Sequence, residues 1–192
     1  MFMTTIASIR TFKPNVTQQE ALRAFTGGLS AAFWRMRTGP LQRIADAYVP
    51  YWLYRVRYSV GSARPLRFFA LDAVDGSLDL FEFPRVPEET QFLSVETRNF
   101  PRPALAESRA AELLREKVLR VIFLQGFFKL RDTSLEVQRE PGEFYLPYWL
   151  AFYGSRNVFR CRVMDAVRRR VEGPKASAFF EQWLARPGGL AA

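Results

Sequence analysis

The chain has 192 residues, of which 48% are hydrophobic and 15% aromatic, enough to bury a core as one domain of moderate size or two small ones. Its net charge of +9 comes almost entirely from arginine, and it contains no histidine and a single cysteine, Cys161. This composition excludes Ser-His-Asp and Cys-His catalysis, an internal disulfide, thiolate metal clusters and nearly every zinc or non-haem iron site. We therefore expect no metal and no cofactor.

The localisation that the sequence predicts is cytoplasmic. No apolar run reaches the roughly 18 residues that a membrane-spanning helix needs. Residues 1–15 lack a basic leader followed by an apolar stretch and a small-residue cleavage site. The single cysteine agrees with a reducing compartment.

The first predicted element is a helix that begins after Thr17. Glu20 completes a capping box with Thr17, and the pair Gly27-Gly28 is expected to end the helix. This glycine pair lacks the lysine and the preceding strand of a phosphate-binding loop. Beyond it, large and basic residues alternate from Phe33 to Arg37, which predicts a strand.

A long strand follows and carries the hexapeptide "YVPYWL", residues 48–53. Alternation places Trp52 on one face and Tyr51 on the other, and both faces are apolar, so both should be covered. Pro50 has no N–H for the sheet and is expected at an edge or a bulge. A hairpin then leads to a strand over residues 66–74, and Asp75-Gly76 predicts a two-residue turn into "SLDLFEF".

The second half repeats this order. A helix is predicted over residues 104–123, then a strand near residues 126–130, then "YLPYWL" at residues 145–150 and a strand ending in Asp165-Ala166-Val167. The turn after it contains Arg168-Arg169 instead of Asp-Gly and is expected to differ. A short helix closes the chain over residues 174–185.

These matches predict a duplication, in which Asp72-Ala73-Val74 corresponds to Asp165-Ala166-Val167. The predicted fold class is α+β, with two tandem repeats, residues 1–95 and 96–192, the second of which also carries the closing helix. Each repeat is expected to pack its helix on its own antiparallel β-meander. The two repeats are expected to form one compact unit by packing their central strands together.

The helix-then-sheet order, with "DAVDG" at the end of a strand and its turn, resembles PepSY-like domains. The pairing of "YxPYW" with "DAV" is similar to bacterial proteins that carry this unit in tandem. PepSY-like domains are mostly regulatory or binding modules, so the resemblance implies a binding role and no catalytic residue. This chain lacks the Thr-Gly that is usual at the turn, and its second copy has no glycine there.

The candidate ligand- or partner-binding residues are the aromatic side chains of the hexapeptides and the arginines just beyond the first one. Their rings could stack on bases or line a groove, or they could form an aromatic core. The set is Tyr48, Tyr51, Trp52, Tyr145, Tyr148, Trp149, Arg55 and Arg57.

Asp72 and Asp165 lie at equivalent strand ends, and two roles are open for them. They could meet as an acid–base pair, or each could accept backbone N–H bonds from its own turn, which the duplication favours. Cys161 stands between two arginines that could lower the pKa of its thiol. Strand alternation points it away from them, which favours a buried hydrophobe.

The leading hypothesis is a non-enzymatic module that binds a protein or peptide, with sheet edges that could accept an added strand. The alternative is nucleic-acid or anionic-surface binding through sheet arginines and the dense run Arg168 to Arg170. A third possibility is a carboxylate-dependent enzyme that uses Asp72 and Asp165.

Overall fold

The computed structural model describes residues 6–58, 64–124, 135–155 and 158–186 and has an α+β fold. Contacts divide the chain into two compact units, and both units contain segments from each half of the sequence. The first unit comprises Met1–Val49, Thr90–Pro101 and Phe144–Ala192, and the second comprises Pro50–Glu89 and Arg102–Glu143. The predicted repeats, 1–95 and 96–192, do not coincide with these units.

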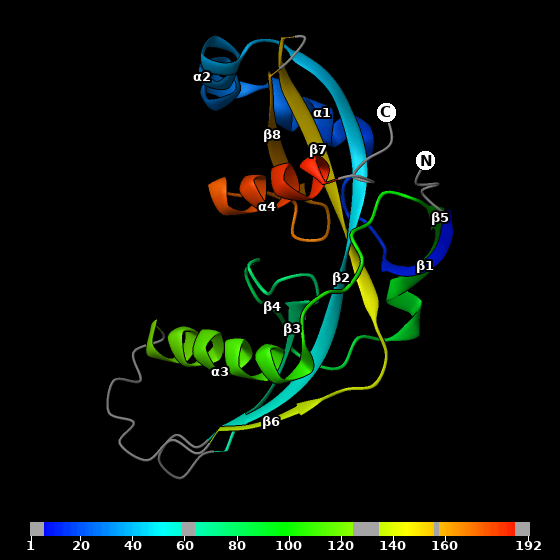
Figure 1. The fold of residues 1–192 in the computed structure, drawn as a ribbon, viewed down its shortest axis with the longest axis vertical. Coiled ribbons are helices and arrows are strands. Elements are labelled where there is room, and N and C mark those ends of the chain that lie inside the picture. The colour runs from blue at the N-terminus through cyan, green and yellow to red at the C-terminus, as the bar shows by residue number, and fades with distance from the viewer. Residues whose placement is uncertain (1–5, 59–63, 125–134, 156–157, 187–192) are drawn as a thin grey trace. The chain divides into compact units, whose positions relative to one another are not determined.

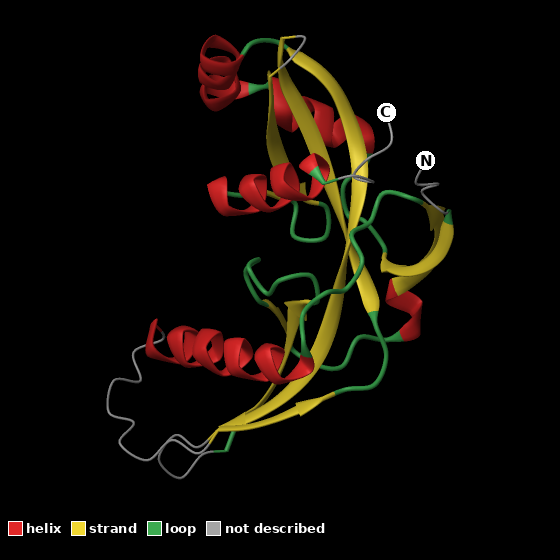
Figure 2. Cartoon of the chain, in the orientation of Figure 1, coloured by secondary structure: helices red, strands yellow, loops and turns green. Residues whose placement is uncertain are grey.

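In its described residues, the first unit combines three helices with a mixed set of strands (Figures 1 and 2). Strand β7 pairs antiparallel with β8 and parallel with β1 at Tyr145, and β1 pairs antiparallel with β5. The elements of this unit are α1 (Gln18–Thr26), α2 (Gly28–Thr38), α4 (Pro174–Ala185), β1 (Ala7–Phe12), β5 (Phe92–Thr97), β7 (Phe144–Ser155), β8 (Val158–Asp165), β9 (Arg170–Val171) and the first part of β2 (Leu41–Tyr58).

The second unit is an antiparallel sheet with one long helix. The second part of β2 lies between β3 and β6, and β3 also pairs with β4. The elements of this unit are α3 (Glu107–Leu124), β3 (Leu66–Asp72), β4 (Phe81–Phe83) and β6 (Leu135–Arg139), and the short 3-10 helix η1 (Glu89–Gln91) stands at its border.

The capping box at the start of α1 is confirmed: the Thr17 side chain accepts from the Glu20 N–H, and the Glu20 carboxylate accepts from the Thr17 N–H. The helix ends where Gly27 begins, as predicted. The predicted helices over residues 104–123 and 174–185 are confirmed as α3 and α4.

The strand predicted from Phe33 to Arg37 is wrong, because these residues lie in helix α2. A run of alternating residues this short also fits a helix. Gly28 takes a positive φ of 75° at the first residue of α2, which lets the chain turn out of α1 and begin a new helix at once. The equivalent strand predicted near residues 126–130 lies outside the described residues.

Helices α3 and α1 each pack on the aromatic hairpin of the other half of the sequence. In the second unit, one face of α3 packs against Trp52, Tyr54, Phe69 and Leu71 on β2 and β3. In the first unit, Phe25 of α1 belongs to the cluster of β7 and β8. The prediction that each repeat packs its helix on its own meander is therefore wrong.

The segment just before each of these two helices is hydrogen-bonded to the alanine that follows the turn aspartate. The Leu105 N–H, just before α3, donates to the Ala73 carbonyl, and the Asn15 N–H, before α1, donates to the Ala166 carbonyl. In both units, backbone hydrogen bonds and apolar packing thus join a helix from one half of the sequence to a hairpin from the other half.

The two hexapeptide strands have matching registers. Tyr51 pairs with Asp72 in the β2–β3 ladder, and Tyr148 pairs with Asp165 in the β7–β8 ladder. Both ladders run without a bulge from that pair onward, so the bulge expected beside each proline is absent from them. Pro50 and Pro147 stand just before the paired residues, where each carbonyl still accepts an N–H. These registers agree with a duplication, which stays a prediction.

Candidate functional site

Most of the aromatic side chains predicted to bind a partner are buried. Tyr51, Trp52, Tyr145 and Tyr148 are between 1% and 8% exposed, and Tyr48 and Trp149 are half-buried. On β7, the Trp149 face packs toward α1 and the Tyr148 ring contacts Phe180 of α4, so the hairpin is covered by helices on both sides (Figure 1). The buried rings belong to the core, and the assignment of these residues to a binding site stays a prediction.

The arginines of the binding hypotheses form ion pairs within the chain. Arg55 pairs with Glu140 at 2.8 Å, and Arg57 pairs with Glu136 at 3.9 Å. In the dense run, Arg168 pairs with Asp165, Arg169 with Glu20 and Arg170 with Glu172. Such pairs reduce the positive charge that these side chains offer to a phosphate backbone. The nucleic-acid interpretation stays a prediction.

Asp72 is fully buried and bonds to its own turn. Its Oδ1 accepts from the N–H groups of Val74, Asp75 and Gly76, and its Oδ2 accepts from Leu78 at 2.8 Å. Burial raises the pKa of the Asp72 carboxyl, and these N–H bonds oppose that rise. These are the bonds that a turn-stabilising role requires.

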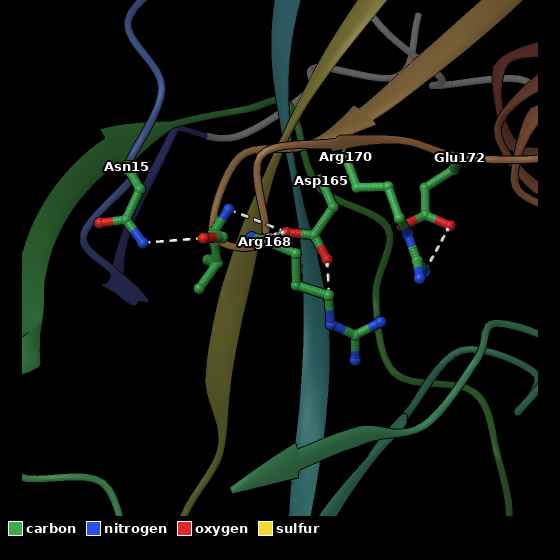
Figure 3. Close-up of polar contacts among 6 residues, drawn as sticks. Asn15, Asp165, Arg168, Arg170 and Glu172 are labelled. Atoms are coloured by element: carbon green, nitrogen blue, oxygen red, sulfur yellow. Dashed lines mark hydrogen bonds and ion pairs between the residues drawn. The ribbon is translucent and has the colours of Figure 1, made fainter.

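Asp165 bonds its turn in the same manner but with fewer donors (Figure 3). Its Oδ1 accepts from the Val167 and Arg168 N–H groups, each at 2.8 Å. Its Oδ2 lies 3.6 Å from Arg168 Nε and has no hydrogen-bond partner among the described residues. Burial raises the pKa of the Asp165 carboxyl, and the turn N–H bonds and the Arg168 charge oppose the rise.

The two turns differ from the sequence-based prediction. The Asp75-Gly76 segment does not join β3 to β4 as a two-residue hairpin, because β4 begins only at Phe81. Arg169, at the position that corresponds to Gly76, also takes a positive φ, 59° against 69°. The second turn therefore repeats this feature of the first, although the sequence indicated a different turn.

Cys161 is buried, and burial raises the pKa of its thiol, which leaves it in the unreactive form. No group of three or more metal-binding side chains occurs among the described residues. Within the same part of the chain, no helix is long and apolar enough to cross a membrane.

An exposed apolar row on α2 is the surface that sequence reasoning missed. Leu29, Phe33 and Met36 are 92%, 55% and 80% exposed. Their spacing of four and then three residues places them on one face of the helix. The same spacing could have been read from the sequence if this segment had been taken as a helix. In the described part of the chain, no other helix or strand carries three exposed large apolar side chains.

The other candidate site is a cavity of about 690 Å³ beside α2, within the first unit. It is lined from three sides, by α2, by β8 with β9, and by α4. The lining residues are Phe33, Trp34, Arg37, Thr38, Arg160, Arg162, Val171, Glu172, Gly173, Pro174, Ser177, Ala178 and Glu181.

Comparison with known proteins places no family on the chain: no protein-family model, curated protein or solved structure matches it. The resemblance to PepSY-like domains stays a prediction.

Proposed function

We propose that the protein is a non-enzymatic binding module that docks an acidic, amphipathic segment of a partner protein on helix α2. The observation that carries the proposal is the row of Leu29, Phe33 and Met36, which the fold leaves exposed. A soluble domain rarely exposes grouped large apolar side chains unless they contact another molecule. Exposed residues at i, i+4 and i+7 are also the usual anchors between an amphipathic helix and its partner.

The charge on α2 indicates which partner fits. The helix contains no acidic residue, and its exposed Arg35 and Arg37 lie in its last turn. Acidic side chains beside apolar anchors would complement this surface and speed association with it. Buried core aromatics and turn-bonded aspartates, in contrast, support a folding role for the two motifs that first suggested a site.

The test compares the wild-type protein with the double variant Leu29→Gln/Met36→Gln, which removes the two most exposed anchors and keeps good helix formers. The matched control is Phe123→Gln, which removes an exposed aromatic side chain from α3. A partner recovered from native lysate is purified, and its affinity for all three proteins is measured. We expect the double variant to bind at least tenfold more weakly and the control to bind like the wild type.

Equal affinity of the double variant would overturn the proposal, as would the absence of any reproducible partner. Light scattering of the purified protein gives a further outcome. A wild-type dimer that the double variant converts to a monomer would show that the α2 row is covered by a second copy of the chain, contrary to the acidic partner proposed.

A further inference from the structure

The cavity between α2, β8 and α4 contains a buried cation with an open hydrogen-bonding position. Arg162 of β8 is only 6% exposed, lines the cavity and has no hydrogen-bond partner for its Nη1 among the described residues. The guanidinium lies 5.5 Å from the Trp34 ring and 5.8 Å from the Phe25 ring. A buried donor without a partner is costly, so such a group indicates a missing acceptor.

Two further features make the cavity favourable for an anion. Helix α4 begins at its wall, and its N-cap Gly173 provides no side-chain cap. Arg37 also lines the cavity, is exposed, and forms no ion pair with the described residues.

The acidic residues of the lining are already engaged. Glu172 pairs with Arg170, while Glu181 accepts from the Cys161 N–H at 2.9 Å and pairs with Arg160 at 3.5 Å. Three arginines and two glutamates leave the lining with one positive charge in excess. That balance favours a singly charged carboxylate over a doubly charged phosphate.

We propose that this cavity binds a small organic carboxylate, with Arg162 as the ion-pairing residue and Phe33 and Trp34 as the wall for an apolar body. The planar guanidinium matches a carboxylate in a two-point contact. The volume falls in the range of small-molecule pockets, about 300–1,000 Å³. The proposal does not depend on partner docking at α2.

The experiment measures binding of 4-phenylbutyrate to the purified full chain by calorimetry and by amide chemical shifts. Phenyl phosphate tests the anion, and the neutral 4-phenylbutanol tests the need for charge. We expect saturable binding of the carboxylate, weaker binding of the phosphate and none of the alcohol. The largest shifts should fall on the lining residues of α2 and α4.

Four variants locate the site. Arg162→Gln should weaken binding of the carboxylate at least tenfold. Arg162→Lys keeps the charge but not the planar donor pair, so it should lose less of the affinity than Arg162→Gln does. Ala178→Glu places a negative charge at an exposed position of the cavity wall and keeps a good helix former, and it should abolish binding even if Arg162→Gln fails to fold. Arg98→Gln, an exposed arginine outside the lining, removes the same charge and should bind like the wild type.

Binding of the alcohol as tight as that of the carboxylate would contradict the role of Arg162. Tighter binding of the phosphate would overturn the choice of a carboxylate. Absence of saturation at millimolar ligand, or unchanged binding by Ala178→Glu, would dismiss the site itself. The pair Leu29→Gln/Met36→Gln leaves the lining intact, so failure of partner docking and failure of the anion site give separate results.

Discussion

In the turn after β3, Asp72 accepts hydrogen bonds from four backbone N–H groups, whereas in the turn after β8 Asp165 accepts two. The first turn uses glycine where the backbone takes a positive φ, and the second uses Arg169. The same conformation is thus reached with many bonds and a permissive residue in one unit, and with fewer bonds and a costlier residue in the other. The comparison teaches that the carboxylate is the shared requirement and that the glycine is not.

The largest effect is expected from Asp72→Ala. The substitution leaves four N–H groups without an acceptor. Three of the lost bonds are buried and the one from Asp75 is partly buried, and each buried N–H without a partner costs about 1–3 kcal/mol. We expect a loss of at least about 3 kcal/mol in the free energy of unfolding, measured by urea denaturation. A loss below about 1 kcal/mol would show that the turn holds without its carboxylate.

Gly76→Ala should cost about 2 kcal/mol. Gly76 has a φ of 69°, and a Cβ there would lie 2.7 Å from Leu113 Cδ1 on α3. Backbone strain and overlap therefore act together. Thermal and urea unfolding measure the loss, and an unchanged midpoint would mean that α3 shifts freely to accept the methyl group.

Asp165→Ala should cost about 1.5 kcal/mol, roughly half the effect of Asp72→Ala, because only two N–H groups lose their acceptor. Their bonds are partly buried, so water can replace part of what is lost. Urea denaturation of both variants side by side makes the comparison direct. Equal losses in the two turns would contradict the difference in bonding.

Asp165→Asn should lower the free energy of unfolding less than Asp165→Ala does, and the size of its effect should depend on pH. The amide oxygen keeps the two backbone bonds, and the amide nitrogen replaces an oxygen that has no hydrogen-bond partner in the described structure. Burial raises the pKa of the Asp165 carboxyl, so the folded protein holds this proton more tightly than the unfolded chain does.

Tighter binding of this proton therefore stabilises the folded wild type in full below the unfolded pKa, about 4. This stabilisation is lost as the pH rises through the folded pKa. The variant cannot titrate at this position. The difference in unfolding free energy should move in favour of Asp165→Asn as the pH rises above the unfolded pKa of about 4. A shift in the opposite direction would mean that the folded state lowers this pKa.

The smallest effect is expected from Arg169→Gly, within about 0.5 kcal/mol of zero. Glycine removes the strain at a φ of 59°, but it loses the exposed ion pair with Glu20 and adds entropy to the unfolded chain. Contrasted with Gly76→Ala, this near-neutral change tests whether only the first turn needs a glycine. A loss above about 1 kcal/mol would give the Arg169 side chain a structural role.

Much of the secondary structure could be predicted because its signals act over a few residues. The Thr17–Glu20 capping box, the apolar spacing of α3 and the alternation of the aromatic strands are all local patterns. Helix α2 was mistaken for a strand because its short run of alternating residues fits both periods. The exposed face that supports the proposed function was missed for the same reason.

The sequence by itself determined the α+β class, the position of both hexapeptides and the presence of an Asp-Ala-Val segment after each of them along the chain. Tertiary structure alone decided which helix covers which hairpin, because the apolar face of either helix could cover either hairpin. Side-chain packing and the hydrogen bonds to the Ala73 and Ala166 carbonyls together select one of the two arrangements. It also brought Arg162, Trp34 and the start of α4 to one cavity. Residues so distant in the chain share no local signal, and only the folded backbone places them together.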